Sequence, residues 1–319
     1  MILWGLLIIV VALLGAFLFG PRTPVDTTVR FDPSKIGSDL DAYLAEREQG
    51  YSDIKPGQAK SILWADPVAR RKTPVALLYI HGFSASSGEI RPVPERVAQA
   101  LGANLYFARL AGHGRSHSDA MGEATVNDWV NDLAEAVEIG HRLGDRVVVI
   151  ATSTGASLVT WALADPQFAD RIDAAVFISP NYGVKANGAF ALTLPFARQI
   201  AHVLVGDRRG FEPANALQAA LWTTDYPVEA LLPMAEIVRL AAGAEVGKIR
   251  TPVLFLISPL DEVVDPVATK AIAARWSGPN EIAEIDTQDP SHHVLAGDAL
   301  SPSSNDRTVQ LASDWFRKL

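Results

Sequence analysis

The sequence predicts an α/β fold with a mostly parallel central sheet and helices on both faces of the sheet. Two observations support this prediction: short β-branched or apolar runs alternate with longer segments of helical periodicity, and this order repeats along most of the chain. The chain has 319 residues, of which 49% are apolar, which is enough to bury one large core. In sheets of this kind, ligand sites lie beyond the carboxyl ends of the strands.

The predicted strands are short and apolar, and a helical segment follows most of them. Strands are expected at Ser61–Trp64, Val75–Ile80, Asn104–Ala108, Val147–Ala151, Ala174–Ile178, Val253–Ile257 and Glu281–Ile285. Helices are expected at Val93–Leu101, Thr125–Leu143, Gly155–Ala164, Pro266–Arg275 and Asn305–Arg317. Helical crossovers of this kind are what successive parallel strands require.

The first 20 residues contain no charged side chain and are dominated by Leu, Ile, Val and Phe. This is about the length that an α-helix needs to cross a bilayer, so residues 1–20 are expected to form an uncleaved transmembrane anchor. The two alternatives are a signal peptide and a buried core helix. A signal peptide usually has a basic start, whereas no Lys or Arg precedes Arg22 here. Basic residues after the segment favour a cytoplasmic location for the rest of the chain. Single N-terminal anchors often break this tendency, so the membrane side stays open.

The rest of the chain is expected to contain a tether, a main domain and an insertion. Residues 21–57 are polar, with one amphipathic helix over Asp39–Gly50, and are interpreted as a juxtamembrane tether. The main domain is expected over residues 58–319. Within it, residues 182–247 are helical in pattern and longer than one crossover requires, so we expect an inserted helical cap. A single ordinary crossover helix is the alternative.

The clearest candidate for chemistry is Ser153, in the segment Ala151-Thr152-Ser153-Thr154-Gly155. It lies where a predicted strand ends and the next helix begins. A serine on such a tight turn has a strained backbone, and small residues two positions before and after it avoid collisions. Here Ala151 stands where glycine is usual. A serine that only caps the start of the helix is the alternative.

A serine hydroxyl is a weak nucleophile at neutral pH, so it needs an imidazole to accept its proton and a carboxylate to orient that imidazole. Both residue types follow Ser153 in the chain. The segment Ser258–Pro266 comes after one predicted strand and supplies aspartates, and Asp289–Val294 comes after the next and supplies histidines. Because parallel strands share one carboxyl edge, we expect both segments to converge on Ser153.

Four further motifs carry a resemblance to a known family. They are His81-Gly82-Phe83, Gly112-His113-Gly114-Arg115-Ser116, Asp261–Pro266 and Ser291–Val294. With these motifs and the order Ser, Asp, His, the chain from about Val75 to its C-terminus resembles the α/β-hydrolase family, especially its monoacylglycerol-lipase and small-carboxylesterase branch. The resemblance implies the α/β-hydrolase fold.

The resemblance also implies a role for individual residues. Ser153 would be the nucleophile, His293 the general base and then acid, and Asp261 the partner that orients the imidazole. The backbone N–H groups of Phe83 and Thr154 would form the oxyanion hole.

Two of these residues have a neighbouring rival. His293 is preferred to His292, because the family's catalytic histidine is followed directly by an aliphatic residue, here Val294. Asp261 is preferred to Asp265, because the family places its acid about four residues after the strand, whereas Asp265 precedes a proline and is interpreted as the cap of the next helix.

The implied activity is that of a serine hydrolase that cleaves carboxylic esters through an acyl-enzyme, as a carboxylesterase or a monoacylglycerol-type lipase. It would need no cofactor, and its partners would be a small-molecule or lipid ester and, through the N-terminal segment, a membrane. The alternatives are an aminopeptidase, another amidase or a thioesterase with the same three residues, and a non-catalytic relative that binds a ligand.

Composition and spacing exclude several other classes. The net charge of −8 argues against nucleic-acid binding, and the lack of cysteine excludes thiol nucleophiles and thiolate metal sites. No metal site is expected, because Gly114 disfavours the helix that would bring His113 and His117 together. The pair Gly112 and Gly114 lacks the third glycine of a dinucleotide loop. His81 and His113 are expected to be structural.

Overall fold

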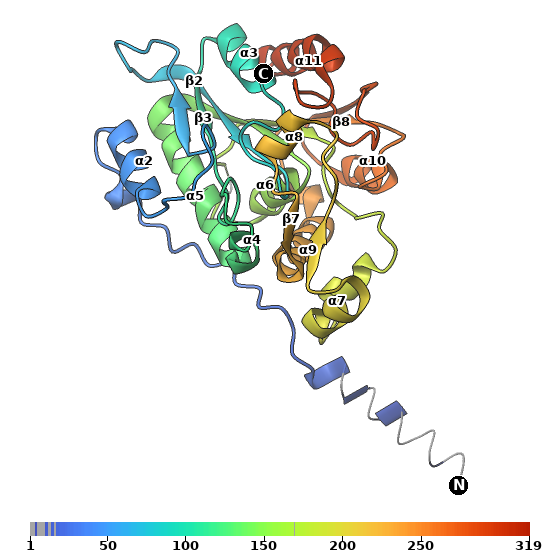
Figure 1. Cartoon of the computed structure of the whole chain (residues 1–319). Helices are drawn as coiled ribbons and strands as arrows, with labels where there is room; N and C mark the ends of the chain where they lie inside the picture. Colours follow the sequence, from blue (N-terminus) through green and yellow to red (C-terminus); the bar gives the residue numbers. More distant parts are fainter. Residues whose placement is uncertain (1–3, 5–9, 12–13, 16, 169) are drawn as a thin grey trace.

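The computed structural model describes residues 4, 10–11, 14–15, 17–168 and 170–319. Its centre is a seven-stranded sheet in the order β1-β3-β2-β4-β5-β8-β9. Strand β1 runs antiparallel to β3, and every other pair of neighbours is parallel. The predicted mostly parallel sheet is therefore confirmed (Figure 1).

All seven predicted strands are present. Their bounds are β1 Ser61–Leu63, β2 Thr73–Ile80, β3 Asn104–Phe107, β4 Gly144–Thr152, β5 Ala174–Ile178, β8 Val253–Ile257 and β9 Asn280–Glu284. The largest difference from the sequence is at the start of β4, which begins at Gly144 rather than Val147 because it pairs with β2 from Thr73 onward. A second sheet of two short strands is formed by β6 (Arg208–Gly210) and β7 (Asp225–Pro227).

The helices largely follow the local sequence signals. Their bounds are α2 Leu40–Glu48, α3 Val93–Leu101, α4 Ala120–Glu123, α5 Val126–Leu143, α6 Thr154–Ala164, α7 Ala197–Val205, α8 Ala216–Leu221, α9 Leu231–Ala242, α10 Pro266–Arg275 and α11 Asn305–Arg317. Short 3₁₀ helices are η1 Pro33–Lys35, η2 Ala189–Thr193, η3 Val228–Ala230, η4 Val246–Lys248 and η5 Pro302–Ser304. Helix α5 begins with a capping box between Thr125 and Asp128, which explains its sharp start.

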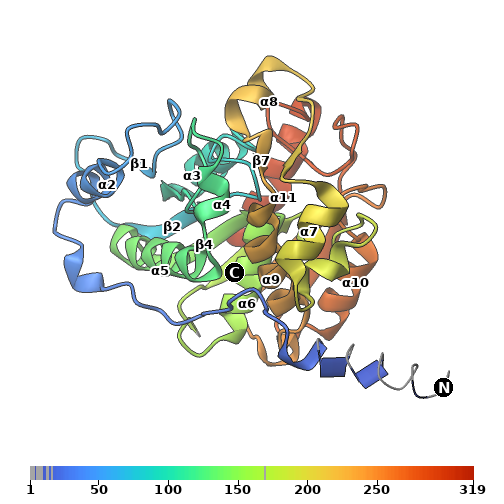
Figure 2. The same ribbon diagram turned by 60° about the horizontal axis from the view of Figure 1, so that its bottom comes forward.

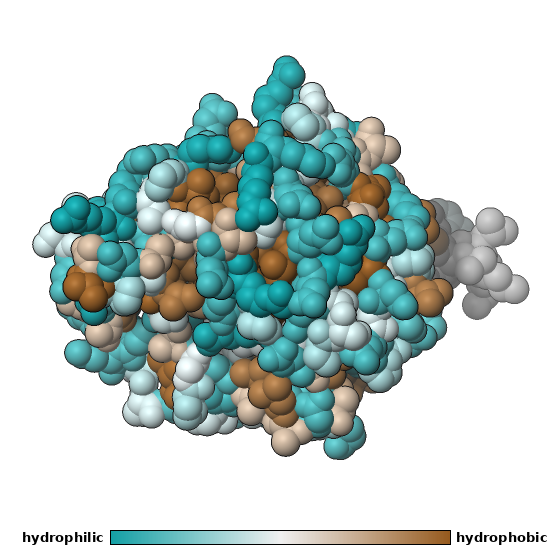
Figure 3. All heavy atoms as spheres, turned by 90° about the horizontal axis from the view of Figure 1, so that it is seen from above, coloured by the Kyte–Doolittle hydropathy of each residue, from teal (hydrophilic) through white to brown (hydrophobic). Residues whose placement is uncertain are grey.

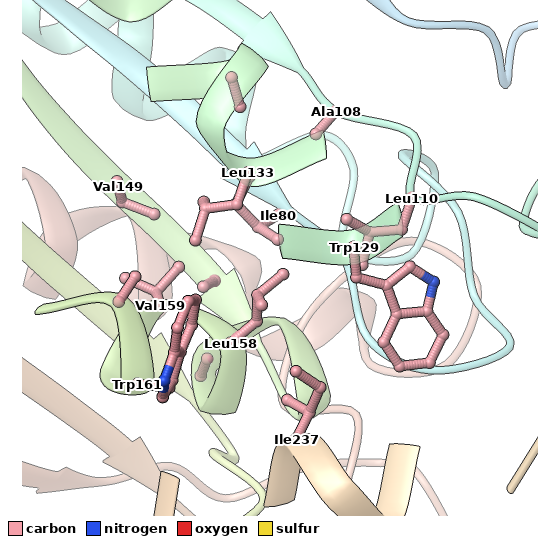
Figure 4. Packing of buried hydrophobic residues seen from close by; sticks show 14 of the residues in the cluster. Ile80, Ala108, Leu110, Trp129, Leu133, Val149, Leu158, Val159, Trp161 and Ile237 are labelled. Atoms are coloured by element: carbon pink, nitrogen blue, oxygen red, sulfur yellow. The ribbon is translucent and has the colours of Figure 1, made fainter. Parts of the chain in front are cut away.

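The sheet has one hydrophobic core on each face, because successive side chains of a strand point to opposite sides. In β2, Ala76, Leu78 and Ile80 enter one core, and Leu77 and Tyr79 enter the other. Helices α5, α6 and α9 cover the first core, and α3 and α11 cover the second. Figure 4 shows part of the first core, where side chains of these three helices meet those of β2 and β4.

Residues 179–252 join the adjacent strands β5 and β8 and are called the β5–β8 segment below. They contain η2, α7, β6, α8, β7, η3, α9 and η4. Helix α9 packs on α6, and α7 lies farther from the sheet (Figure 2). Three apolar side chains of this segment, Phe190, Val203 and Leu204, are more than half exposed. By contrast, hydrophilic residues predominate on the face seen in Figure 3, with small hydrophobic patches between them.

The predicted transmembrane anchor over residues 1–20 is corrected by the structure. Across the part of the chain that is described, no helix is both long enough and apolar enough to cross a membrane. A spanning helix needs about 20 consecutive apolar residues, and the residues described as helical in this region are 4, 10–11, 14–15 and 17–19. Anchoring of the protein by this helix was therefore a wrong prediction from apolar composition alone. Part of the predicted anchor lies outside the described residues, namely 1–3, 5–9, 12–13 and 16.

Candidate active site

Ser153 lies on the tight turn between β4 and α6. Its φ of 50° and ψ of −117° fall in a region that residues with a side chain rarely adopt. Gly155 allows the turn, because a Cβ there would come within 2.5 Å of the carbonyl oxygen of His81. The alternative that Ser153 caps α6 is excluded, since its side chain makes no capping hydrogen bond. The hydroxyl is therefore available for another partner.

The side chains of Ser153, His293 and Asp261 meet at the carboxyl edge of the sheet, although they come from three separate loops. The Nε2 atom of His293 lies 3.0 Å from Ser153 Oγ, and its Nδ1 atom lies 2.8 Å from Asp261 Oδ2. Ser153 and Asp261 are buried, and the side chain of His293 is 12% exposed. With the proton on Nδ1, the ring donates a hydrogen bond to the carboxylate, and Nε2 is left to accept a hydrogen bond from the serine hydroxyl.

The loop that carries His293 is held from both sides. Asp289 Oδ2 accepts the backbone N–H groups of His293 and Val294, each at 2.9 Å, and the hydroxyl of Ser179 donates to the carbonyl of His293 at 2.7 Å. The neighbouring His292 differs, because its buried Nδ1 has no hydrogen-bond partner among the described residues. The structure thus brings His293 to Ser153 through backbone contacts as well as through its ring.

The two aspartates of the preceding loop have different partners. Besides its contact with the imidazole, Asp261 accepts the N–H groups of Val263 and Val264 at 2.8 and 2.9 Å. Asp265 accepts the N–H of Val267 and caps α10, as its position before a proline indicated. Asp261 is therefore fixed in orientation by its own loop, while Asp265 serves the helix.

Charges around His293 favour its protonated form. Burial of the ring works to lower its pKa, but the hydrogen bond and charge of Asp261 oppose this effect, and the carboxylates of Glu89 and Asp289 add to them. The net result is that the pKa of His293 is raised above its ordinary value. A neutral His293 is consequently a better proton acceptor than a free imidazole.

Backbone N–H groups flank Ser153 on two sides. Thr154 is the first residue of α6, so its N–H has no acceptor within the helix. On the other side, Gly82 approaches so closely that a Cβ there would lie 3.2 Å from Ser153 Cβ. Phe83 follows Gly82, and its ring packs edge-on against Tyr226 of the β5–β8 segment, with centroids 5.3 Å apart. The two chain segments predicted to stabilise an oxyanion therefore both lie beside the serine.

Two other buried histidines hold the surrounding loops. His81 Nε2 accepts the N–H of Leu110 at 3.1 Å, and His113 Nε2 accepts the N–H of Ser84 at 3.1 Å, while His113 Nδ1 lies 3.1 Å from the carbonyl oxygen of Ala111. Burial lowers the pKa of His81 to about 4 and that of His113 well below its ordinary value. Both rings therefore stay neutral, in the structural role expected for them.

Sequence analysis missed two buried carboxylates near Ser153. Asp289 had a signal, because it opens the quoted segment Asp289–Val294, but it was not recognised as the acceptor that holds the histidine loop. Glu89 had none, since a glutamate in a polar loop is normally exposed. In the structure Glu89 is only 3% exposed and accepts the N–H of Gly82 at 2.8 Å.

Comparisons with known proteins agree with this geometry. The family model described as serine aminopeptidase, S33 matches residues 72–293. The thermostable monoacylglycerol lipase of Bacillus sp. (strain H-257) is 27% identical over 246 residues, which are 77% of this chain and 93% of that protein.

Two solved structures are similar to the chain. One is a metagenome-derived lipolytic enzyme, with a TM-score of 0.68 and 21% identity over 83% of this chain and all of the other. The second is the monoacylglycerol lipase of Paleococcus ferrophilus, with a TM-score of 0.60 and 15% identity over 81% of this chain and 98% of the other. The expected α/β-hydrolase fold is confirmed by these matches.

Proposed function

We propose that Ser153, His293 and Asp261 form the catalytic triad of this chain, which belongs to the serine aminopeptidase, S33 family. The chain is a carboxylic ester hydrolase of the lipase and esterase type. The observation that carries this proposal is the unbroken line of contacts from Ser153 Oγ to His293 Nε2 at 3.0 Å and from His293 Nδ1 to Asp261 Oδ2 at 2.8 Å. An activated serine requires this arrangement of nucleophile, base and orienting acid.

The reaction then proceeds in two halves. Ser153 Oγ attacks the ester carbonyl carbon while His293 Nε2 takes the hydroxyl proton, and the bond to the alcohol breaks as His293 returns that proton to the leaving oxygen. Water next attacks the acyl-enzyme, giving its proton to His293, and Ser153 leaves with the proton restored. Asp261 stays ionised throughout and stabilises the imidazolium that forms in each half.

Negative charge that develops on the carbonyl oxygen requires donors already in place. We assign this role to the backbone N–H groups of Phe83 and Thr154. The first follows Gly82, which lies against Ser153, and the second is at the positive N-terminus of α6, where an anion is favoured.

For the substrate, we propose a monoacylglycerol or a similar small lipid ester. Two relatives are monoacylglycerol lipases, and the β5–β8 segment, predicted as a cap over residues 182–247, brings apolar side chains to the loops around Ser153. Tyr226 packs on Phe83, and Met234 Sδ lies 3.9 Å from Nδ2 of Asn181, which follows β5. An acyl chain would bury its methylene groups against such a surface.

The test compares hydrolysis of monoacylglycerols of increasing chain length by the wild type, Ser153→Ala and Ser157→Ala. Ser157 is a matched control, because it is also buried on α6 but donates to the carbonyl oxygen of Asn181. Ser153→Ala should lower kcat by ~10⁴-fold or more, and Ser157→Ala should retain activity within about tenfold of the wild type. Activity that persists in Ser153→Ala would overturn the nucleophile assignment.

Aminoacyl amides of matched size provide the second arm of the same experiment. The family description raises peptide hydrolysis as an alternative, which requires a carboxylate to bind the substrate amine. In the β5–β8 segment, Glu229 pairs with Arg198 at 3.0 Å and Glu236 pairs with Arg239 at 2.6 Å. We therefore expect esters to be cleaved faster, and faster cleavage of the amides would replace the lipid ester proposal.

A further inference from the structure

Glu89 is a buried carboxylate that the triad does not use. It lies in the loop after β2, and its Oε2 atom accepts two hydrogen bonds, from the N–H of Gly82 and from the hydroxyl of Tyr79, each at 2.8 Å. A buried carboxylate is unfavourable unless its charge is stabilised by partners. Burial raises the pKa of Glu89, and the hydrogen bonds from Gly82 and Tyr79, together with the charge of a protonated His293, oppose this effect.

The contacts of Glu89 lead to both sides of Ser153. On one side, the bonded Gly82 lies between the carboxylate and the serine: a Cβ at Gly82 would come 2.8 Å from Glu89 Oε1 and 3.2 Å from Ser153 Cβ. On the other side, the hydroxyl of Tyr79 lies 3.2 Å from Oγ1 of Thr152, the residue directly before the nucleophile. One side chain thus joins the Gly82 loop to the turn that carries Ser153.

Phe83, the proposed oxyanion donor, lies between two fixed backbone groups. The N–H before it, that of Gly82, is bound by Glu89, and the N–H after it, that of Ser84, is bound by His113 at 3.1 Å. With both neighbours held, the peptide plane of Phe83 has little freedom to rotate. Preorganised donors of this kind stabilise a developing oxyanion without reorganisation during the reaction.

Glu89 also belongs to the set of charges around His293. The titratable groups that act on this imidazole come from three loops: Asp261 after β8, Asp289 in the histidine's own loop, and Glu89 after β2. A nearby cation is the ammonium of Lys185, which donates to the carbonyl of Asp261 at 2.5 Å. When Glu89 is ionised, its charge favours protonation of His293, and a substitution that removes the charge makes this protonation less favourable.

We propose that Glu89 is a positioning residue for ester hydrolysis: its carboxylate fixes the Gly82–Phe83 backbone beside Ser153 and, as an anion, stabilises the imidazolium of His293. This inference rests on the proposed triad. Glu89 does not touch the substrate in this account. It acts through a backbone N–H, through Tyr79 and through its charge.

Two substitutions separate the hydrogen bond from the charge. Glu89→Gln keeps an oxygen that can accept the Gly82 N–H but removes the charge, whereas Glu89→Ala removes both. Glu138→Gln is the control, since Glu138 is a largely buried carboxylate on α5 that is bound to Arg142 and Arg171 and is not among the groups acting on His293. Active sites are counted with a fluorophosphonate, so that kcat refers to folded enzyme only.

In Glu89→Gln, the acid limb of the kcat/KM profile should move to lower pH by roughly half a unit, because His293 loses a stabilising anion. In Glu89→Ala, kcat should fall by ~10²-fold with KM changed by less than about threefold, since the loss affects the transition state. Glu138→Gln should show neither effect. A merely structural role would lower the number of titrated sites and leave the acid limb unmoved.

An unmoved acid limb in Glu89→Gln overturns the proposal, and so does a wild-type kcat per titrated site in Glu89→Ala. If Glu89→Ala fails to fold, the pH profile of the isosteric Gln variant decides alone. Ser153→Ala is measured alongside: its inactivity together with a wild-type profile of Glu89→Gln refutes only the role of Glu89. Activity in Ser153→Ala refutes the triad itself.

Discussion

His293 and the pair His81 and His113 all lie near the carboxyl edge of the sheet, but they contact different partners. His293 lies between a carboxylate and a hydroxyl, at 2.8 and 3.0 Å. His81 and His113 accept hydrogen bonds from the backbone N–H groups of Leu110 and Ser84. The pKa of His293 is raised, while burial lowers the pKa of His81 to about 4 and that of His113 well below its ordinary value.

The difference shows that the partner, and not burial alone, determines what a histidine does. Burial disfavours the charged ring at each of these positions, and only the carboxylates around His293 reverse that effect. His293 is thereby equipped to accept and return a proton. His81 and His113 accept hydrogen bonds from backbone N–H groups, which fixes the loops beside Phe83, the proposed oxyanion donor.

The largest expected effect follows from replacing His293. His293→Ala should lower kcat by ~10⁴-fold or more, because Ser153 then has no base. The measurement is ester hydrolysis by protein whose folding is verified by circular dichroism. His292→Ala is the matched control and should keep most of the activity; the reverse order of the two variants would contradict the assignment of His293.

The second effect is a pH dependence of stability that His81 produces. Its folded pKa of about 4 lies below the unfolded value, so the neutral ring stabilises the fold above about pH 6.5, and this contribution is lost as the pH falls toward 4. The free energy of unfolding should fall by roughly 3 kcal/mol over this pH range.

Urea unfolding of the wild type and of His81→Gln between pH 7 and pH 4, approximately the range between the two pKa values, measures this term. The wild type should lose more stability than the variant, whose amide does not titrate, over the same interval. Equal losses would mean that His81 titrates normally and would break the contrast with His293.

A third effect distinguishes the loop-holding role of His113 from catalysis. His113→Ala leaves the buried N–H of Ser84 without its acceptor, so the free energy of unfolding should fall by ~1–3 kcal/mol. Displacement of the neighbouring Phe83 should lower kcat by roughly 10- to 100-fold. The variant should thus be less stable than His293→Ala but more active, and an inactive, fully stable His113→Ala would contradict this division of roles.

The smallest effect extends the comparison to the two aspartates. Asp265→Ala removes the cap of α10 and should lower the free energy of unfolding by about 1 kcal/mol, with kcat close to that of the wild type. Asp261→Ala should instead lower kcat by ~10⁴-fold. Thermal unfolding and ester hydrolysis of both variants provide the measurement, and a large loss of kcat in Asp265→Ala would show that the two carboxylates were assigned the wrong way round.

Much of the fold was predictable because its signals are local. Strands β5 and β8 have the predicted bounds, since a parallel strand buried on both faces is a continuous apolar run. The loops of Ser153, Asp261 and His293 were recognisable because each motif lies directly after a strand. Their convergence followed from the shared carboxyl edge of a parallel sheet.

Other features depend on tertiary contacts that sequence alone does not display. Glu89 is buried, and Tyr79 and Gly82, which are seven or more residues away in the chain, provide the donors for its carboxylate. The hydroxyl of Ser179 reaches the histidine loop across 114 residues of chain. The N-terminal prediction was wrong for a different reason: it rested on apolar composition alone, and no helix among the described residues is long and apolar enough to cross a membrane.

The most direct test of the account is the rate at which a fluorophosphonate modifies Ser153, located by mass spectrometry, in the wild type, His293→Ala and His113→Ala. The reagent reports activation of the hydroxyl without requiring the natural substrate. Rapid labelling at Ser153 in the wild type, a loss of ~10³-fold or more in His293→Ala and a smaller loss in His113→Ala are predicted. Labelling of another residue, or undiminished labelling in His293→Ala, would contradict the proposal that His293 activates Ser153.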